Sequence, residues 1–204
     1  MNKMKMGKKN YLYPNPTIIV GANVNGRANY LNVSYSGIVN RDPAMISISI
    51  NKSHYTCNAI KENKTFSINI PSLNMLEVTD YCGIVSGKEV DKSKLFDTFY
   101  GILENAPMIQ ECPINIECRV ISELDFDGSN ITYIGEVIES YTEEKYLTKN
   151  LPDLKKINPI LLSIYDFNYY CVGEKIGKAW HAGKDVGVID DNDFKKERLS
   201  IGCK

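Results

Sequence analysis

The sequence is poor in the residues that build metal centres and nucleophilic sites. It has only two histidines, His54 and His181, and its six cysteines are irregularly spaced without a Cys-x-x-Cys pair. A zinc site needs Cys and His ligands clustered at short, characteristic spacings, so we expect no metal centre. A P-loop, a Gly-x-Gly-x-x-Gly fingerprint and a Ser-His-Asp arrangement are absent as well. Hydrolase and nucleotide-cradling chemistry of these common kinds is therefore not indicated.

An excess of charge and a long apolar run are also missing. The 24 basic and 25 acidic residues give a net charge of -1, which offers no electrostatic reason to expect nucleic acid or a membrane as a partner. No stretch approaches the ~20 apolar residues of a membrane span. The lysine-rich start is not followed by the apolar region of a signal peptide. We expect a cytoplasmic protein with reduced cysteines.

The length and composition are those of one globular domain. The chain has 204 residues, of which 43% are hydrophobic and 24% charged. We expect a flexible N-terminal tail at 1–13, because its lysines stand outside any apolar pattern. The domain is expected at 14–184. Residues 185–204 turn strongly polar and are expected to form a tail outside the core.

Most of the domain has the alternation of half-buried strands. In the run AMISISI at 44–50, for example, apolar residues flank Ser47 and Ser49. Helices are expected from Thr56, with Ser53 as the N-cap, over 74–85, and as a short piece from Asp91. Strands are predicted at 17–22, 28–35, 44–50, 65–70, 114–124, 131–140, 160–165 and 169–172. Because helices and strands do not alternate regularly, we predict a mainly β, antiparallel barrel with a few short helices.

The segment between residues 49 and 56 could bind a phosphate group. A strand ends and a helix begins here, and a helix N-terminus offers unpaired amides with a partial positive charge. Ser53 and Thr56 add hydroxyls, and Lys52 and His54 add cationic side chains. A plain strand-to-helix turn with a capping serine has the same composition, so this pattern alone leaves both interpretations open.

Three other features allow a functional or a structural interpretation. Asn32, Ser34 and Ser36 share one face of the expected strand, where they could hydrogen-bond a heterocycle with amide-like groups or simply face water. Cys82 stands among apolar residues of the expected helix without a neighbouring base, which favours a core cysteine. His181 lies in a loop-like stretch and has no identifiable partner, which favours a structural or exposed histidine.

Taken in order, several motifs resemble the flavin reductase-like family, and its flavoredoxin branch in particular. No single motif is decisive, but together they span residues 14–184. They are NPTIIVGA at 15–22, NYLNVSYSGIVN at 29–40, DPAMISISI at 42–50 followed by SHYT at 53–56, FSINIPS at 66–72, DYCG at 80–83, SG at 86–87 with DK at 91–92, AP at 106–107, ECP at 111–113 and GEV at 135–137.

The resemblance implies an antiparallel, Greek-key-like split β-barrel that binds FMN and forms a homodimer, with each flavin near the subunit interface. It implies no catalytic side chain, because FMN does the redox chemistry. Carried onto this chain, it places Asn32, Ser34, Ser49, Ile50 and Asn51 against the flavin ring and its ribityl chain. It assigns the phosphate to Ser53, His54 and Thr56, with Ser86 and Lys92 closing the site.

The chain departs from the family pattern at three places. Threonine is common where Asn32 stands, and arginine is common where His54 stands. Family members that use pyridine nucleotides often carry Gly-Asp-His where this chain has Gly128-Ser129-Asn130. We therefore expect an oxidoreductase that transfers electrons through bound FMN, with a redox partner protein or NAD(P)H as its partner. An NAD(P)H:flavin oxidoreductase that reduces free FMN and a non-enzymatic flavin-binding module remain the alternatives.

Overall fold

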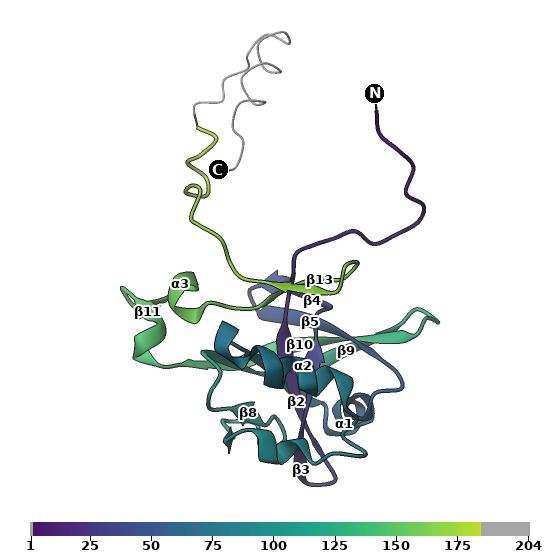
Figure 1. Cartoon of the computed structure of the whole chain (residues 1–204). Helices are drawn as coiled ribbons and strands as arrows, with labels where there is room; N and C mark the ends of the chain where they lie inside the picture. Colours follow the sequence, from purple (N-terminus) through teal and green to yellow (C-terminus); the bar gives the residue numbers. More distant parts are fainter. Residues whose placement is uncertain (1, 185–204) are drawn as a thin grey trace. The chain divides into compact units, whose positions relative to one another are not determined.

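The computed structural model describes residues 2–184, so the predicted polar tail at 185–204 lies outside the described residues. The chain divides into two compact units, Met1–Val172 and Gly173–Lys204. The second unit is described only over 173–184, where it contains turns without a helix or strand. Within residues 2–184, no helix is both long enough and apolar enough to span a bilayer. Every strand and helix found within residues 2–184 belongs to the first unit (Figure 1).

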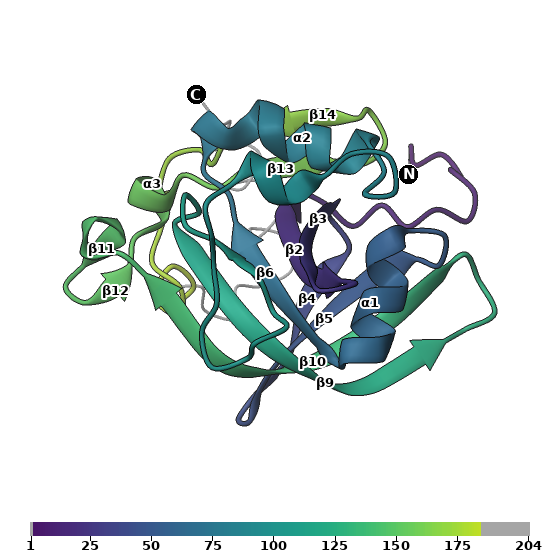
Figure 2. The same cartoon turned by 90° about the horizontal axis from the view of Figure 1, so that it is seen from below.

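A seven-stranded antiparallel sheet forms the body of the first unit and curves around its core (Figure 2). This confirms the predicted mainly β, antiparallel fold. The two edge strands of the sheet are consecutive in the chain, and only Ser34 and Tyr35 connect them. In spatial order the strands are β3 (Arg27–Val33), β2 (Ile18–Val24), β6 (Thr65–Ile70), β9 (Ile114–Asp125), β10 (Asn130–Thr142), β5 (Ala44–Asn51) and β4 (Ser36–Arg41). We call the opening between the β3 and β4 edges the seam of the barrel.

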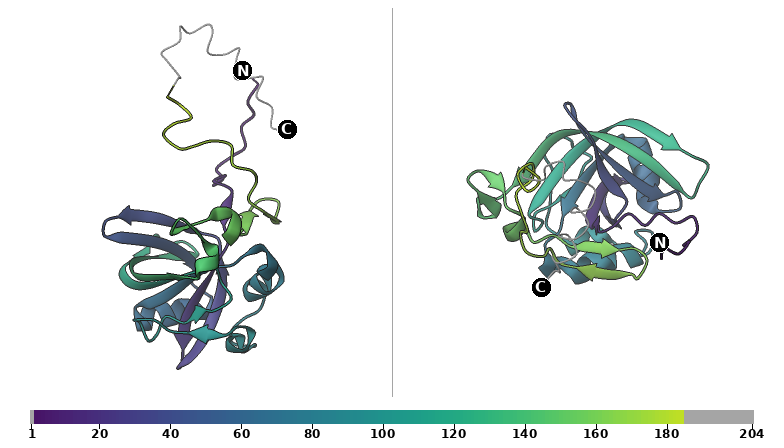
Figure 3. Two further views of the ribbon diagram at one scale, coloured as in Figure 1. Left: turned by 90° about the vertical axis from the view of Figure 1, so that its left-hand side faces the viewer. Right: turned by 90° about the horizontal axis from the view of Figure 1, so that it is seen from above.

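Smaller elements cover the seven-stranded sheet. A three-stranded sheet lies beside α2, as two views of the chain show (Figures 2 and 3). It consists of β1 (Asn15–Pro16), β13 (Leu161–Ser163) and β14 (Asn168–Tyr170). The two-residue pairs are β7 (Thr98–Phe99) with β8 (Met108–Ile109) and β11 (Leu147–Thr148) with β12 (Leu151–Pro152). The helices are α1 (Tyr55–Asn63), α2 (Leu76–Ile84), α3 (Leu154–Ile157) and the 3-10 turns η1 (Leu73–Met75), η2 (Lys92–Leu95) and η3 (Glu144–Tyr146).

The core follows the alternation read from the sequence. On β5, Ile48 and Ile50 are 0% and 2% exposed, whereas Ser47 and Ser49, which alternate with them, are half-buried. Burial of large apolar side chains is the main favourable term in folding, so this register is strongly fixed. Helix α1 packs on the same core, and its first turn is tied to β10 because the Tyr133 hydroxyl donates to the Cys57 carbonyl at 3.1 Å.

The local predictions were wrong at two points near the seam. The strand expected at 28–35 ends at Val33, and a separate strand begins at Ser36, so Asn32, Ser34 and Ser36 do not share one strand face. Ser53 is not the helix cap: the N-cap is His54, without a side-chain hydrogen bond. The Asn51 side chain explains this, since its Oδ1 accepts from both the Ser53 amide at 2.9 Å and the Ser53 hydroxyl at 2.8 Å.

Candidate functional site

Two adjoining pockets open at the seam of the barrel. The first, which we call the seam pocket, has a volume of about 280 Å³ and is lined by residues 31–35 and 49–51, His54, Asn130, Leu162, Ile164 and Phe167. The second, which we call the helix pocket, has a volume of about 250 Å³ and is lined by Asn29, Leu31, Lys92 and residues 53–56 and 83–87. Leu31 and His54 line both pockets, so the two adjoin, and we call them together the cleft.

The structure brings all ten predicted site residues into this cleft. The seam pocket contains Asn32, Ser34, Ser49, Ile50, Asn51 and His54. The helix pocket contains Ser53, His54, Thr56, Ser86 and Lys92. They come from β3, β5, α1, η2, the β3–β4 loop and the loops that precede α1 and follow α2, and they span up to 60 positions in the chain (92 - 32). Their convergence is therefore a property of the tertiary fold rather than of one local motif.

The start of α1 gives the helix pocket an uncapped helix terminus. Among residues 2–184 no side chain caps the helix, and no acidic residue stands in its first turn, so the terminus keeps its partial positive charge. Thr56 is 2% exposed, and its hydroxyl accepts from the Asn29 amide at 2.8 Å, which leaves the hydroxyl hydrogen for another acceptor. The pocket can therefore receive an anion.

Lys92 places an ammonium group in the wall of the helix pocket. The residue is 2% exposed, and its Nζ donates to the Tyr30 carbonyl at 2.9 Å and to the Cys82 carbonyl at 2.7 Å. Burial lowers the pKa of Lys92. An ammonium group has three N–H donors, and these two carbonyls occupy two of them. The third remains for a ligand.

His54 stands at the junction of the two pockets. Burial and the positive charge of Lys92 both lower the pKa of His54 below its ordinary value. At neutral pH the side chain is therefore a neutral imidazole that can donate from one nitrogen and accept at the other. In the ligand-free protein, the positive charge near this junction therefore comes from Lys92 and not from His54.

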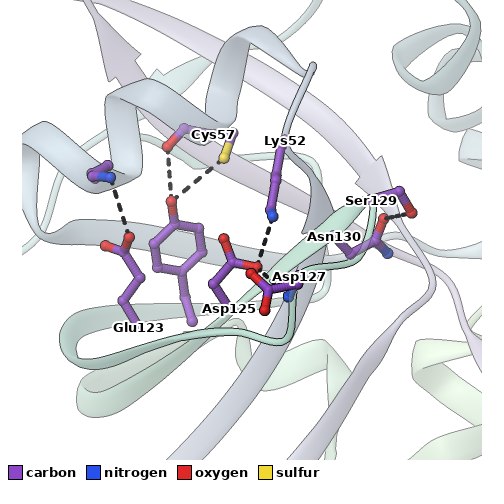
Figure 4. A network of polar contacts seen from close by, with 9 residues as sticks. Lys52, Cys57, Glu123, Asp125, Asp127, Ser129 and Asn130 are labelled. Carbon is purple, nitrogen blue, oxygen red and sulfur yellow. Dashed lines mark hydrogen bonds and ion pairs between the residues drawn. The ribbon is translucent and has the colours of Figure 1, made fainter.

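The structure corrects the expected role of Lys52 as a phosphate-binding cation. Lys52 lines neither pocket; its Nζ pairs with Asp125 Oδ1 at 2.7 Å at the tip of the β9–β10 hairpin (Figure 4). Its backbone amide also donates to the Ser129 carbonyl at 2.9 Å. These contacts hold the hairpin tip beside the end of β5 and so position Asn130, which pairs with Asn51 and lines the seam pocket.

The seam pocket combines a polar edge with an apolar wall. On the polar side, Ser49 shares a 2.7 Å hydrogen bond with Thr132 across two strands. The apolar wall is formed by Leu162, Ile164 and Phe167, which belong to the β13–β14 hairpin and its turn. The sequence analysis did not assign these three residues to the site. They lie more than 100 positions from β5 and carry no polar signature, so only the fold brings them there.

Two local features mark the cleft as a built site. Asn32 lines the seam pocket, yet its Oδ1 is buried and has no hydrogen-bond partner among the described residues. Buried acceptors are almost always paired, so this one awaits a donor. In the helix pocket, a Cβ added to Gly87 would lie 2.1 Å from Asn29 Oδ1 and 3.1 Å from the Tyr55 ring. Only glycine lets the loop after α2 approach this closely.

The sequence profile of the flavin reductase-like domain matches residues 10–161, which is most of the chain and includes nearly all of this cleft. The chain belongs to the flavin reductase-like family. Among solved structures, it is 45% identical to a flavoredoxin from Methanosarcina acetivorans, with a TM-score of 0.89 and coverage of 92% of this chain and 100% of that one. It is 33% identical to the flavoredoxin of Desulfovibrio vulgaris (Miyazaki F), with a TM-score of 0.83 and coverage of 89% and 100%.

The fold is shared with more distant solved structures. An FMN-binding protein from Thermus thermophilus is 20% identical, with a TM-score of 0.74 and coverage of 87% of this chain and 97% of that one. At this identity the likeness shows a common fold alone. These matches confirm the resemblance read from the ordered motifs, and they identify the antiparallel sheet as the split barrel expected from it.

Proposed function

We propose that this chain binds FMN in the seam and helix pockets and transfers electrons through it. The observation that carries the proposal is the pair of adjoining pockets: one has an uncapped helix start and a buried ammonium, and the other has an amide carbonyl without a partner among residues 2–184. The flavoredoxins and the FMN-binding protein named above support it as proteins of the same fold. FMN has the matching two ends, a phosphate and a heterocycle with amide-like groups.

The helix pocket fits the phosphate end of the molecule. A phosphate at a helix N-terminus accepts hydrogen bonds from free amides and is favoured by the helix dipole. Here Lys92 adds a charge-assisted donor, while Thr56 and Ser86 add hydroxyls. Because Lys92 is already held by two backbone carbonyls, little side-chain entropy remains to be lost on binding.

The seam pocket fits the flavin ring. An isoalloxazine has a polar pyrimidine edge and an apolar benzenoid end, and this pocket likewise combines the polar Asn32, Ser34 and Ser49 with apolar side chains of the β13–β14 hairpin. When bound, FMN supplies a ring that accepts and gives up hydride or single electrons. The residues of this chain bind the ring, orient it and exclude water from its buried side.

The proposed electron source is a redox partner protein rather than NAD(P)H. Asn130 occupies the place where pyridine-nucleotide-using relatives often carry histidine, and it lines the seam pocket. Its Oδ1 accepts from the Ser129 hydroxyl at 3.2 Å, so the Asn130 amide is already engaged with its neighbour (Figure 4). An asparagine amide cannot take up or release a proton as an imidazole does.

Flavin uptake tests the proposal directly. Purified protein is titrated with FMN and with riboflavin, which lacks the phosphate, and binding is followed by flavin fluorescence and visible absorbance. We expect one FMN per chain and binding of riboflavin weaker by about 100-fold, the loss of ~2.7 kcal/mol of charge-assisted phosphate contacts. Protein that stays colourless and takes up neither flavin would refute the proposal.

Anaerobic mixing of the FMN-loaded protein with reductants tests the electron source. We expect dithionite to bleach the flavin absorbance at once, while NADH and NADPH leave it unchanged over seconds. Rapid bleaching by either pyridine nucleotide would instead establish the NAD(P)H:flavin oxidoreductase alternative.

His54 is expected to make FMN binding depend on pH. A bound phosphate dianion favours the imidazolium, so binding raises the pKa of His54 from its lowered value in the free protein. FMN affinity should therefore rise as pH falls from 8 towards 6.5, until protonation of the phosphate itself, near pH 6, opposes it. His54→Arg should remove this dependence and tighten binding at pH 8 by about tenfold, because arginine is always charged. Equal pH profiles for the two proteins would contradict this role.

We also propose that two copies of the chain form a homodimer through β4. This strand is an edge of the seven-stranded sheet, and its Ile38 and Val39 are 86% and 46% exposed. Exposed apolar edge strands are unusual in monomers and are commonly covered by a partner. Because β4 borders the seam, a second copy would also shield the flavin. Analytical ultracentrifugation should show a dimer for the wild type and a monomer for Ile38→Lys; a monomeric wild type would exclude it.

A further inference from the structure

A chain of hydrogen bonds joins three distant elements to the wall of the seam pocket. Asp80 on α2 accepts from the Tyr169 hydroxyl at 2.7 Å, and Tyr169 on β14 accepts in turn from the Asn32 Nδ2 at 3.2 Å. Asn32 lies near the end of β3 and lines the seam pocket, whereas Asp80 and Tyr169 do not line it. The side-by-side position of α2 and the β13–β14 hairpin makes this contact possible (Figures 2 and 3).

The chemistry of the three groups determines which group donates and which accepts in each hydrogen bond of this chain, which we call the relay. A carboxylate has no hydrogen to donate, so the Tyr169 hydroxyl must donate its only hydrogen to Asp80. The hydroxyl oxygen can then only accept from Asn32, which obliges the Asn32 side chain to turn its NH₂ group towards Tyr169. An asparagine side chain can otherwise rotate so that its oxygen and its NH₂ group change places, because the two have nearly the same shape. Here Asp80 prevents this rotation by fixing the Tyr169 hydroxyl as an acceptor.

Burial keeps the relay in this state over the working pH range. Burial and the hydrogen bond to Asp80 raise the pKa of Tyr169 to about 12, so the phenol stays protonated. The Asn32 side chain is also confined sterically. A Cβ added to Gly83 would lie 3.3 Å from the Asn32 Cβ and 3.5 Å from its Nδ2, so the helix backbone packs closely against the amide.

With its NH₂ group committed to Tyr169, Asn32 has only its carbonyl left. That Oδ1 is the buried acceptor that has no partner among the described residues. We propose that Asp80 and Tyr169 are positioning residues that fix Asn32 as a hydrogen-bond acceptor, so that the site selects a ring carrying an N–H. This inference rests on the proposed FMN function. An oxidised flavin has a single ring N–H, at N3, and the Asn32 carbonyl would accept a hydrogen bond from this group.

The test compares FMN with N3-methyl-FMN, which lacks the N–H, on the full-length protein. Dissociation constants are measured by fluorescence titration for the wild type, Tyr169→Phe, Asp80→Asn and Tyr170→Phe. The last is the matched control, because Tyr170 lies on the same strand and its hydroxyl donates to the surface carboxylate of Asp166 at 3.1 Å. Asp80→Asn keeps the size of the side chain but allows the Tyr169 hydroxyl to donate or to accept, so the direction of the relay is lost.

We expect the wild type and Tyr170→Phe to prefer FMN over N3-methyl-FMN by at least about tenfold, the ratio expected for one buried hydrogen bond. In Tyr169→Phe and Asp80→Asn, the Asn32 amide can turn, and the preference should fall to about threefold or less. The comparison of the two flavins on the wild type tests the inference even if a variant fails to fold. Equal binding of the two flavins by the wild type, or an unchanged preference in Tyr169→Phe or Asp80→Asn, would overturn the inference while leaving FMN binding intact. Absence of FMN binding in the wild type would instead reject the proposed function.

Discussion

Replacement of Lys92 by methionine is expected to weaken FMN binding by about 100-fold, or ~2.7 kcal/mol. Lys92 is the buried cation of the helix pocket, and two carbonyls already aim its ammonium group. Methionine has a similar length but no donor, so the phosphate loses a charge-assisted hydrogen bond that water does not replace in a buried wall. The lowered pKa of His54 should also relax upwards, because Lys92 is one of its two causes. That partial gain is too small to restore the affinity.

Lys94→Met is the matched control for this variant. Lys94 lies in the same 3-10 turn, but it reaches only a surface ion pair with Asp91 at 4.0 Å, and its side chain is 80% exposed. Its removal should leave FMN affinity within about twofold, since exposed ion pairs contribute little. Both variants are titrated with FMN, and their stability is measured by urea denaturation. Equal FMN affinities in the two variants would contradict the assignment of Lys92 to the phosphate.

The fold was predictable from the sequence to the extent that burial is periodic. The strand expected at 65–70 coincides with β6, and the hairpin expected from 114–124 and 131–140 is β9–β10 with slightly wider limits. Strand β4 was not predicted, because five of its six residues are exposed and alternation has no meaning there. This strand nevertheless forms one edge of the seam. The residues that connect it to β3, Ser34 and Tyr35, therefore line the seam pocket.

That the ten predicted residues line one cleft could be anticipated from the sequence, whereas their interactions could not. The ordered motifs place all ten residues in one cleft, which composition alone does not do. Side-chain partners were not predictable, since they depend on which groups the tertiary fold places within hydrogen-bond distance. Lys52 pairs with Asp125 outside the cleft, and the Ser53 hydroxyl donates to Asn51 although Ser53 lines the helix pocket. Asn29, which supports Thr56, gave no signal beyond being a polar residue in a strand.

A second large effect is expected outside the cleft, at Glu117. This residue of β9 is fully buried, and its carboxylate accepts from the amides of Ile102 and Leu103 at 2.9 and 2.6 Å and from the Tyr141 hydroxyl at 2.6 Å. The Glu117 hydrogen bond and charge raise the pKa of Tyr141 to about 12, so the phenol remains a donor. Three donors therefore depend on one side chain. Glu117→Ala should lower the free energy of unfolding by about 4 kcal/mol, because three partly buried donors lose their charged acceptor together.

Glu123→Ala, on the same strand, separates this effect from the loss of any glutamate. Glu123 pairs at the surface with Lys61 and Lys64 at 3.4 and 3.5 Å, and its removal should cost at most about 1 kcal/mol. Urea denaturation measures both changes, and FMN titration of the folded protein completes the comparison. Since Glu117 lines neither pocket, its loss should leave FMN affinity of the folded protein unchanged, unlike the loss of Lys92. A loss of stability at Glu117 no greater than at Glu123 would show that the loop at 101–103 finds other partners. The two buried residues are thus expected to have separable roles: Lys92 binds the ligand, and Glu117 stabilises the fold.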